Sequence, residues 1–127
     1  MQVVHEAWGC NDDAMLRAAM LFYGGIAGHQ EGPCGAISGL SIALGFRYRD
    51  SSGNPEKAQK AHDEAEKKAD EIIAQFNKKF GSIICRDLVG VDFSQPDLVE
   101  KFMGNPDNRD RCPGYVRFIV EKLIEMD

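Results

Sequence analysis

The sequence lacks the features that mark several large classes of protein. No uncharged apolar run reaches the roughly 20 residues that a membrane span needs, so no membrane-spanning helix is expected. Lys and Arg (15) are outnumbered by Asp and Glu (20), and the net charge of −5 does not predict a nucleic-acid partner. The opening residues, MQVVHEAWGC, contain neither a basic segment nor a sustained apolar run, so no secretory signal is visible. Together these absences predict a cytoplasmic protein.

Cysteine is scarce and widely spaced. The chain has four cysteines, Cys10, Cys34, Cys85 and Cys112, and no two of them form the Cys-x-x-Cys pair of zinc ribbons and thioredoxin-like sites. The Cys-x-x-Cys-His motif that attaches haem covalently is also missing. In the cytoplasm, cysteines act as free thiols, metal ligands or redox groups more often than as permanent cross-links. Any site that the four cysteines share must therefore be assembled by the fold.

Strand signals are missing as well, because no segment alternates apolar and polar residues between two turn signals. Apolar residues instead recur at spacings of three and four, so we expect an all-α protein. The predicted architecture is an irregular bundle of five or six helices around a central apolar helix, in a single helical domain over residues 1–127. The helices are expected at about 11–23, 33–48, 55–80 and 82–89, after Ser94, and from Cys112 onward.

The segment over residues 32–48, GPCGAISGLSIALGFRY, has no charged side chain before Arg47. A helix without a polar face is predicted to lie inside a protein, so this helix is expected at the centre of the core. Gly35, Gly39 and Ala43 recur every four residues along one side, where another backbone can approach closely. The spacing leaves open whether that neighbour belongs to the same chain or to a second subunit of a homodimer.

Cys10, Cys34 and Cys112 each fall at a predicted helix N-terminus. Unpaired N–H groups and the helix dipole favour an anion there, so the pKa of these thiols is expected to be lowered. Cys34 is the strongest candidate, because Gly32 and Gly35 leave the backbone around its sulfur uncovered. Cys85 is expected to face inward among apolar neighbours, where an inert structural role is the alternative.

A glycine-rich loop, GGIAGHQEGP, leads into the central helix and contains His29. Because its charge state shifts readily, this histidine is a candidate base or ligand, and an exposed side chain without a role is the alternative. The loop follows no predicted strand and has no Gly-Lys-Ser/Thr ending, so it matches neither nucleotide-binding fingerprint. We expect it to allow a tight reversal of the chain and access to Cys34.

The cysteine pattern resembles the C_GCAxxG_C_C family of redox-active proteins. The motif reads Cys34-Gly35-Ala36-Ile37-Ser38-Gly39, Cys10 matches the upstream cysteine, and Cys85 and Cys112 match the two downstream ones. The resemblance covers nearly the whole chain and implies redox activity through the cysteines. It also implies an association of some members with transporter genes and a similarity to part of split-Soret cytochromes. It carries over no substrate, and without a haem attachment motif it does not transfer haem binding.

Three hypotheses follow. The leading one is thiol/disulfide exchange in which Cys34 reacts with one of the other three cysteines. Its partner would be another redox protein or a transporter-associated protein. Whether the protein acts as an enzyme stays open. The second is a metal or iron–sulfur module in which Cys10, Cys34, Cys85 and Cys112 supply a tetrahedral ligand set for zinc or a cluster. The third is a helical partner-binding module whose cysteines are inert.

Overall fold

The computed structural model describes residues 1–126 and confirms an all-α fold. Within those residues the only pairing of extended backbone is an isolated antiparallel bridge between Pro33 and Ile84. The predicted count of five or six helices is not confirmed, because the described chain contains eight helical segments. In order these are α1 (Gln2–Ala7), α2 (Ala14–Ala18), α3 (Gly35–Arg47), α4 (Pro55–Phe80), α5 (Cys85–Val89), α6 (Pro96–Gly104), α7 (Pro106–Arg109) and α8 (Arg111–Ile124).

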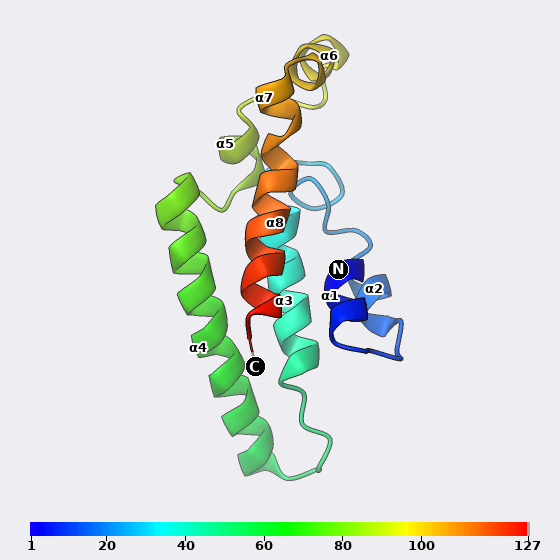
Figure 1. Cartoon of the computed structure of the whole chain (residues 1–127), viewed down its shortest axis with the longest axis vertical. Coiled ribbons are helices and arrows are strands. Elements are labelled where there is room, and N and C mark those ends of the chain that lie inside the picture. Colours follow the sequence, from blue (N-terminus) through cyan, green and yellow to red (C-terminus); the bar gives the residue numbers. More distant parts are fainter. Residues whose placement is uncertain (127) are drawn as a thin grey trace.

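The helices are arranged around the adjacent pair α3 and α8 (Figure 1). The long helix α4 packs along one side of this pair, and the short helices α1 and α2 lie on the other side. Helices α5, α6 and α7 gather at the end of the molecule where α8 begins. Because α3 also begins toward that end, the first turns of α3, α5 and α8 lie in one region. No helix in residues 1–126 is long and apolar enough to cross a membrane.

The core is formed mainly between α3, α4 and α8. Leu40 and Ala43 of α3 and Phe76 of α4 are fully buried. The ring centroids of Phe76 and Phe80 are 4.7 Å apart, and those of Phe80 and Tyr115 on α8 are 4.8 Å apart. Tilted and edge-on aromatic contacts of this kind add to the free energy gained by burying the rings. This aromatic cluster fixes α8 against α4 and so holds the start of α8 in place.

The prediction of a central helix enclosed on all sides is not confirmed. Helix α3 packs against α2, α4 and α8, but Ser41 and Gly45 on one of its sides are exposed. The small residues do permit a close approach, and at Gly35 and Gly39 the neighbours belong to the same chain. A methyl group added at Gly35 would lie 2.9 Å from the carbonyl oxygen of Phe22, and one at Gly39 would lie 3.3 Å from the sulfur of Met1.

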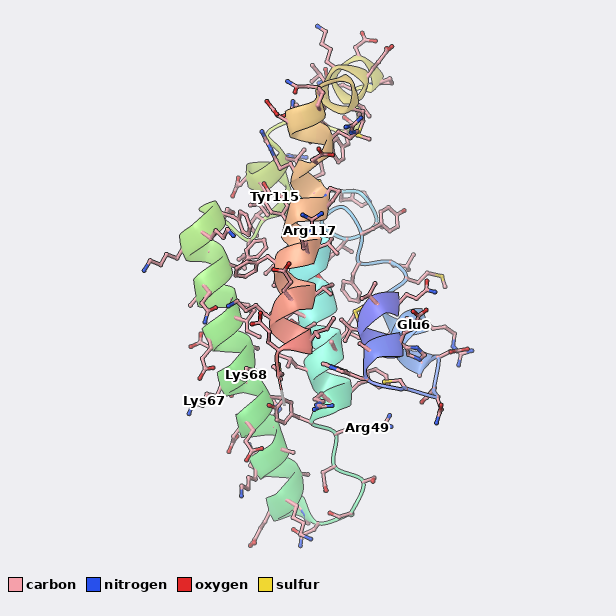
Figure 2. All side chains as sticks on the ribbon, viewed as in Figure 1. Glu6, Arg49, Lys67, Lys68, Tyr115 and Arg117 are labelled. Atoms are coloured by element: carbon pink, nitrogen blue, oxygen red, sulfur yellow. The ribbon has the colours of Figure 1, made fainter. Side chains whose placement is uncertain are left out.

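Helix α4 matches its prediction residue for residue. The side chain of Asn54 accepts hydrogen bonds from the N–H groups of Glu56 and Lys57, and Gly81 ends the helix in a left-handed conformation. Ile72 and Phe76 are buried, whereas the predicted polar face is largely exposed, with Lys67 directed away from the bundle (Figure 2). Local signals at both ends therefore agree with the tertiary packing here.

The N-terminal prediction is largely wrong. The helix expected over residues 11–23 is confined to Ala14–Ala18, and a helix that was not expected, α1, precedes it. After α2 the chain turns so that the carbonyl of Phe22 reaches the first residue of α3. Tertiary contact with α3 thus outweighs the helical propensity of residues 19–23.

The C-terminal half follows its prediction with two changes. Helix α5 begins at Cys85 rather than at Ser82, because the Ser82 hydroxyl accepts a hydrogen bond from the N–H of Ile84 and the chain stays extended there. The loop GNPDNRDR contains the short helix α7, whose first turn is capped by Asn105. Gly90 ends α5 as expected, and Tyr115, Ile119 and Leu123 form the buried side of α8.

Candidate thiol site

Cys34, Cys85 and Cys112 line one cavity of about 840 Å³. They come from three segments that are distant in sequence: the start of α3, the start of α5 and the start of α8. Leu16 of α2, residues between α2 and α3, and part of the glycine-rich loop also line this cavity. The fold therefore assembles three of the four cysteines around a shared space.

All three cysteines occupy the first turn of a helix. Cys34 is the N-cap of α3, Cys85 is the first residue of α5, and Cys112 is the second residue of α8. The predicted position at a helix N-terminus is confirmed for Cys34 and Cys112. It is wrong for Cys10, which precedes α2 without joining its first turn because the N-cap there is Asp13. The position of Cys85 was missed, because its predicted helix began three residues too early.

A short antiparallel contact places Cys34 next to Cys85. The N–H of Cys34 donates to the carbonyl of Ile83 at 2.7 Å, and the N–H of Cys85 donates to the carbonyl of Gly32 at 3.0 Å. Because side chains alternate along extended backbone, the two cysteines lie on the same face of this contact. Diagonal neighbours across such a pair are separated by roughly 7–8 Å. Cys34 and Cys85 are not joined by a disulfide, and Cys10 and Cys112 are free thiols as well.

Burial raises the pKa of the Cys34 thiol above its ordinary value. The N–H groups of Ala36 and Ile37 lower it again, although neither forms a capping hydrogen bond of ordinary geometry with the sulfur. The predicted lowering of this pKa is therefore wrong, because desolvation of the thiolate outweighs the effect of the helix terminus. The thiol is protonated at neutral pH.

Burial and mutual repulsion both oppose ionisation of these three thiols. Burial raises the pKa of Cys85, and negative charges on Cys34 and Cys112 raise it further. Burial raises the pKa of Cys112, and a negative charge on Cys34 raises it further. Because repulsion between thiolates is mutual, one thiolate in the cavity disfavours ionisation of the other two thiols. At Cys34 the N–H groups of Ala36 and Ile37 favour the thiolate.

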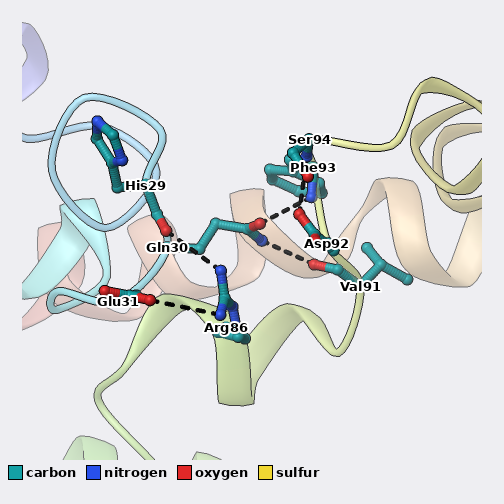
Figure 3. A network of polar contacts seen from close by, with 8 residues as sticks. All are labelled: His29, Gln30, Glu31, Arg86, Val91, Asp92, Phe93 and Ser94. Carbon is teal, nitrogen blue, oxygen red and sulfur yellow. Dashed lines mark hydrogen bonds and ion pairs between the residues drawn. The ribbon is translucent and has the colours of Figure 1, made fainter.

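Gln30 connects the glycine-rich loop to the segment after α5 (Figure 3). Its side chain is only 1% exposed; the amide nitrogen donates to the carbonyl of Val91 at 2.8 Å, and the amide oxygen accepts from the N–H of Phe93 at 2.8 Å. The Gln30 side chain also lowers the pKa of Cys85 by hydrogen bonding. This residue was not predicted, since an isolated glutamine in a glycine-rich loop carries no recognisable signal.

The expected role of His29 is not supported. Its side chain is exposed, and it is not among the residues that line the cavity. Its backbone carbonyl instead accepts a 3.5 Å hydrogen bond from Arg86, which also lies 3.7 Å from the carboxylate of Glu31 (Figure 3). These contacts tether the loop to α5 on the outer side of Gln30.

Cys10 lies apart from the other cysteines. It lines a separate cavity of about 510 Å³ together with Trp8, Arg47 and Arg49. The predicted set of four convergent thiolates is thus not formed, and across residues 1–126 no group of three or more His, Cys, Asp or Glu side chains is arranged to hold a metal ion. The arrangement brings together three thiols in a mostly apolar cavity.

Comparison with known proteins agrees with the cysteine pattern. No curated protein and no solved structure matches the chain. A family model described as "Putative redox-active protein (C_GCAxxG_C_C)" matches residues 1–126, which include all four cysteines and the motif at Cys34. The chain therefore belongs to the C_GCAxxG_C_C family of redox-active proteins.

Proposed function

We propose that the protein carries out thiol/disulfide exchange in which Cys34 is the attacking residue and Cys85 resolves the mixed disulfide. The observation that carries this proposal is the convergence of Cys34, Cys85 and Cys112 on one cavity. Cys34 is the attacking group because the N–H groups of Ala36 and Ile37 favour its thiolate, and thiolate is the form that attacks a disulfide.

The exchange balances as a two-electron reaction with an organic disulfide. The Cys34 thiol loses its proton, and its sulfur attacks one sulfur of the substrate, which breaks the substrate S–S bond. The first substrate thiolate leaves and takes up a proton. Cys85 then loses its proton and attacks the Cys34 sulfur, so the second substrate thiolate leaves and is protonated. The substrate disulfide becomes two thiols, while Cys34 and Cys85 become a disulfide.

Cys85 is the resolving group because backbone hydrogen bonds hold its segment beside that of Cys34. A disulfide requires Cα atoms within about 4.4–6.8 Å, and diagonal neighbours lie just beyond this range at roughly 7–8 Å. A small shift of residues 32–34 would close the gap without unfolding α3, because Cys34 precedes the first residue of that helix.

Disulfide mapping after exchange tests the proposal. The reduced protein is incubated with 2,2′-dithiodiethanol, quenched with acid, digested and analysed by mass spectrometry. We expect a Cys34–Cys85 cross-link in the native chain and in Cys10→Ser, and a mixed disulfide on Cys34 in Cys85→Ser. Cys34→Ser should form neither product. A dominant cross-link that includes Cys10, or unaltered exchange in Cys34→Ser, would overturn the proposal.

A further inference from the structure

The cavity around the three thiols has an unusual lining. Among residues 1–126, none of the side chains that form it belongs to Asp, Glu, Lys, Arg or His. Its walls are formed by apolar and aromatic side chains and by glycine backbone, with Phe22, Tyr23, Phe93 and Tyr115 as the aromatic members. The site that is closest to the reactive sulfurs therefore offers no side-chain charge to a bound molecule.

Few neutral polar groups remain available in this cavity. The hydroxyl of Tyr115 donates to the carbonyl of Leu88 at 3.0 Å and is thus already used within the protein. Tyr23 lies at the rim, where its side chain is 60% exposed. Inside the cavity the three thiols are the main polar side-chain groups, and thiols are weak hydrogen-bonding partners. A charged ligand that lost its hydration there would find no charged side chain to offset the loss.

The cavity at Cys10 provides an internal contrast. Arg47, Arg49 and Asp12 line it, so charged groups surround that cysteine. The same chain thus places one cysteine among charges and three in a space without charged side chains. The volume of about 840 Å³ at the three thiols falls within the range of about 300–1,000 Å³ that is typical of small-molecule sites.

We infer that the substrate of this site is a small uncharged organic disulfide with apolar substituents. This inference rests on the proposed function, because it specifies the chemical class of the disulfide that Cys34 attacks. Disulfides whose substituents carry carboxylate or ammonium groups enter poorly, because those groups would be desolvated beside the thiols. The products are the two corresponding uncharged thiols, and the protein is left with its Cys34–Cys85 disulfide.

Exchange rates with a matched series of small disulfides test the inference. The probes are 2,2′-dithiodiethanol (neutral), cystamine (cationic) and 3,3′-dithiodipropionate (anionic), and each rate is divided by the rate of the same probe with free 2-mercaptoethanol. We expect the neutral probe to react at least about tenfold faster at Cys34 than either charged probe. Equal normalised rates for the three probes would overturn the inference.

An alkylation experiment separates failure of this inference from failure of the proposed function, because it requires no disulfide chemistry. Iodoacetamide and iodoacetate differ mainly in charge, and mass spectrometry gives the rate at each cysteine. We expect the ratio of neutral to anionic reagent to be at least about tenfold higher at Cys34 than at Cys10, which lies among arginines. A high ratio without disulfide exchange would contradict the proposed function alone. Equal ratios would contradict the uncharged site.

A charge placed at the rim offers a gain-of-preference test. Val116 lines the cavity and is 48% exposed, so Val116→Lys can be accommodated without burying the ammonium group. The variant should raise the relative rate with 3,3′-dithiodipropionate several-fold, because an opposite charge then stands near the entrance. Val3→Lys is the matched control, since Val3 is 56% exposed and lies outside the lining. An equal gain in both variants would show that the effect comes from overall charge rather than from the cavity.

Discussion

The backbone N–H of Cys34 donates a 2.7 Å hydrogen bond to the carbonyl of Ile83, two residues before Cys85. This bond and its counterpart from Cys85 to Gly32 connect the start of α3 to the start of α5. The contact holds two cysteines from distant parts of the sequence on one face of an antiparallel pair. The candidate site is therefore positioned by backbone hydrogen bonds, while the thiols themselves remain free to react.

Gln30→Met is expected to destabilise the protein. The substitution keeps a similar side-chain length but leaves the carbonyl of Val91 and the N–H of Phe93 without their partner. A buried polar group left unpaired costs about 1–3 kcal/mol, so we expect a loss of about 2–4 kcal/mol in the free energy of unfolding, measured in urea. Gln59→Met is the control, because its amide donates to the exposed carboxylate of Asp63 on α4. A similar small effect in both variants would contradict the role of Gln30.

Gly25→Ala should be strongly destabilising because two effects coincide. Gly25 has a φ of +69°, and an added Cβ would lie 2.6 Å from Cα of Gln30 and 2.8 Å from Cβ of Cys85. Overpacking of this kind costs about 1–3 kcal/mol or more. Gly53→Ala isolates the backbone effect, since Gly53 has a φ of +73° and nothing within 4 Å of the added atom. Thermal unfolding should show a clearly larger loss for Gly25→Ala, and equal losses would contradict close packing of the loop on Cys85.

Stability should fall as the pH rises into the alkaline range. Burial raises the pKa values of Cys34, Cys85 and Cys112, so these thiols hold their protons more tightly in the folded chain than in the unfolded one. Their stabilising contribution is complete below the ordinary thiol value of 9.0 and is lost as the pH rises through the folded values. Urea unfolding between about pH 8 and 11 measures this loss. The decline should be shallower in Cys34→Ser, and an identical slope would contradict burial of the Cys34 thiol.

Tyr115→Phe removes a single buried hydroxyl at the cavity wall. The hydroxyl donates to the carbonyl of Leu88 at 3.0 Å, and the ring packs against Phe80. Loss of this hydrogen bond should cost about 1 kcal/mol, while the retained ring keeps α8 against α4. Denaturant titration gives the difference relative to Tyr23→Phe, whose side chain is 60% exposed and should show no measurable change. An unchanged stability in Tyr115→Phe would contradict a stabilising role of this hydrogen bond.

Local signals in the sequence were sufficient where they agreed with the packing. Asn54, Pro55 and Gly81 specify the ends of α4, and a regular apolar spacing specifies its buried face. Local signals were not sufficient at residues 11–23, where α2 ends at Ala18 and the backbone of Phe22 and Tyr23 lies close to Gly35 of α3. They were also not sufficient at Ser82, whose hydroxyl accepts a hydrogen bond from the N–H of Ile84, so that α5 begins only at Cys85.

The sequence by itself determined the helical class, the family, and the placement of Cys34 and Cys112 at helix starts, because periodicity, turn residues and the Cys-Gly-Ala-x-x-Gly motif are local properties. Only the tertiary structure decided which cysteines meet. The antiparallel contact of residues 32–34 with residues 83–85 unites Cys34 with Cys85, and the packing of α8 adds Cys112, while Cys10 is left in another cavity. Tertiary burial also decided the ionisation of Cys34, because desolvation depends on the surrounding atoms and outweighs the helix terminus that the sequence could predict.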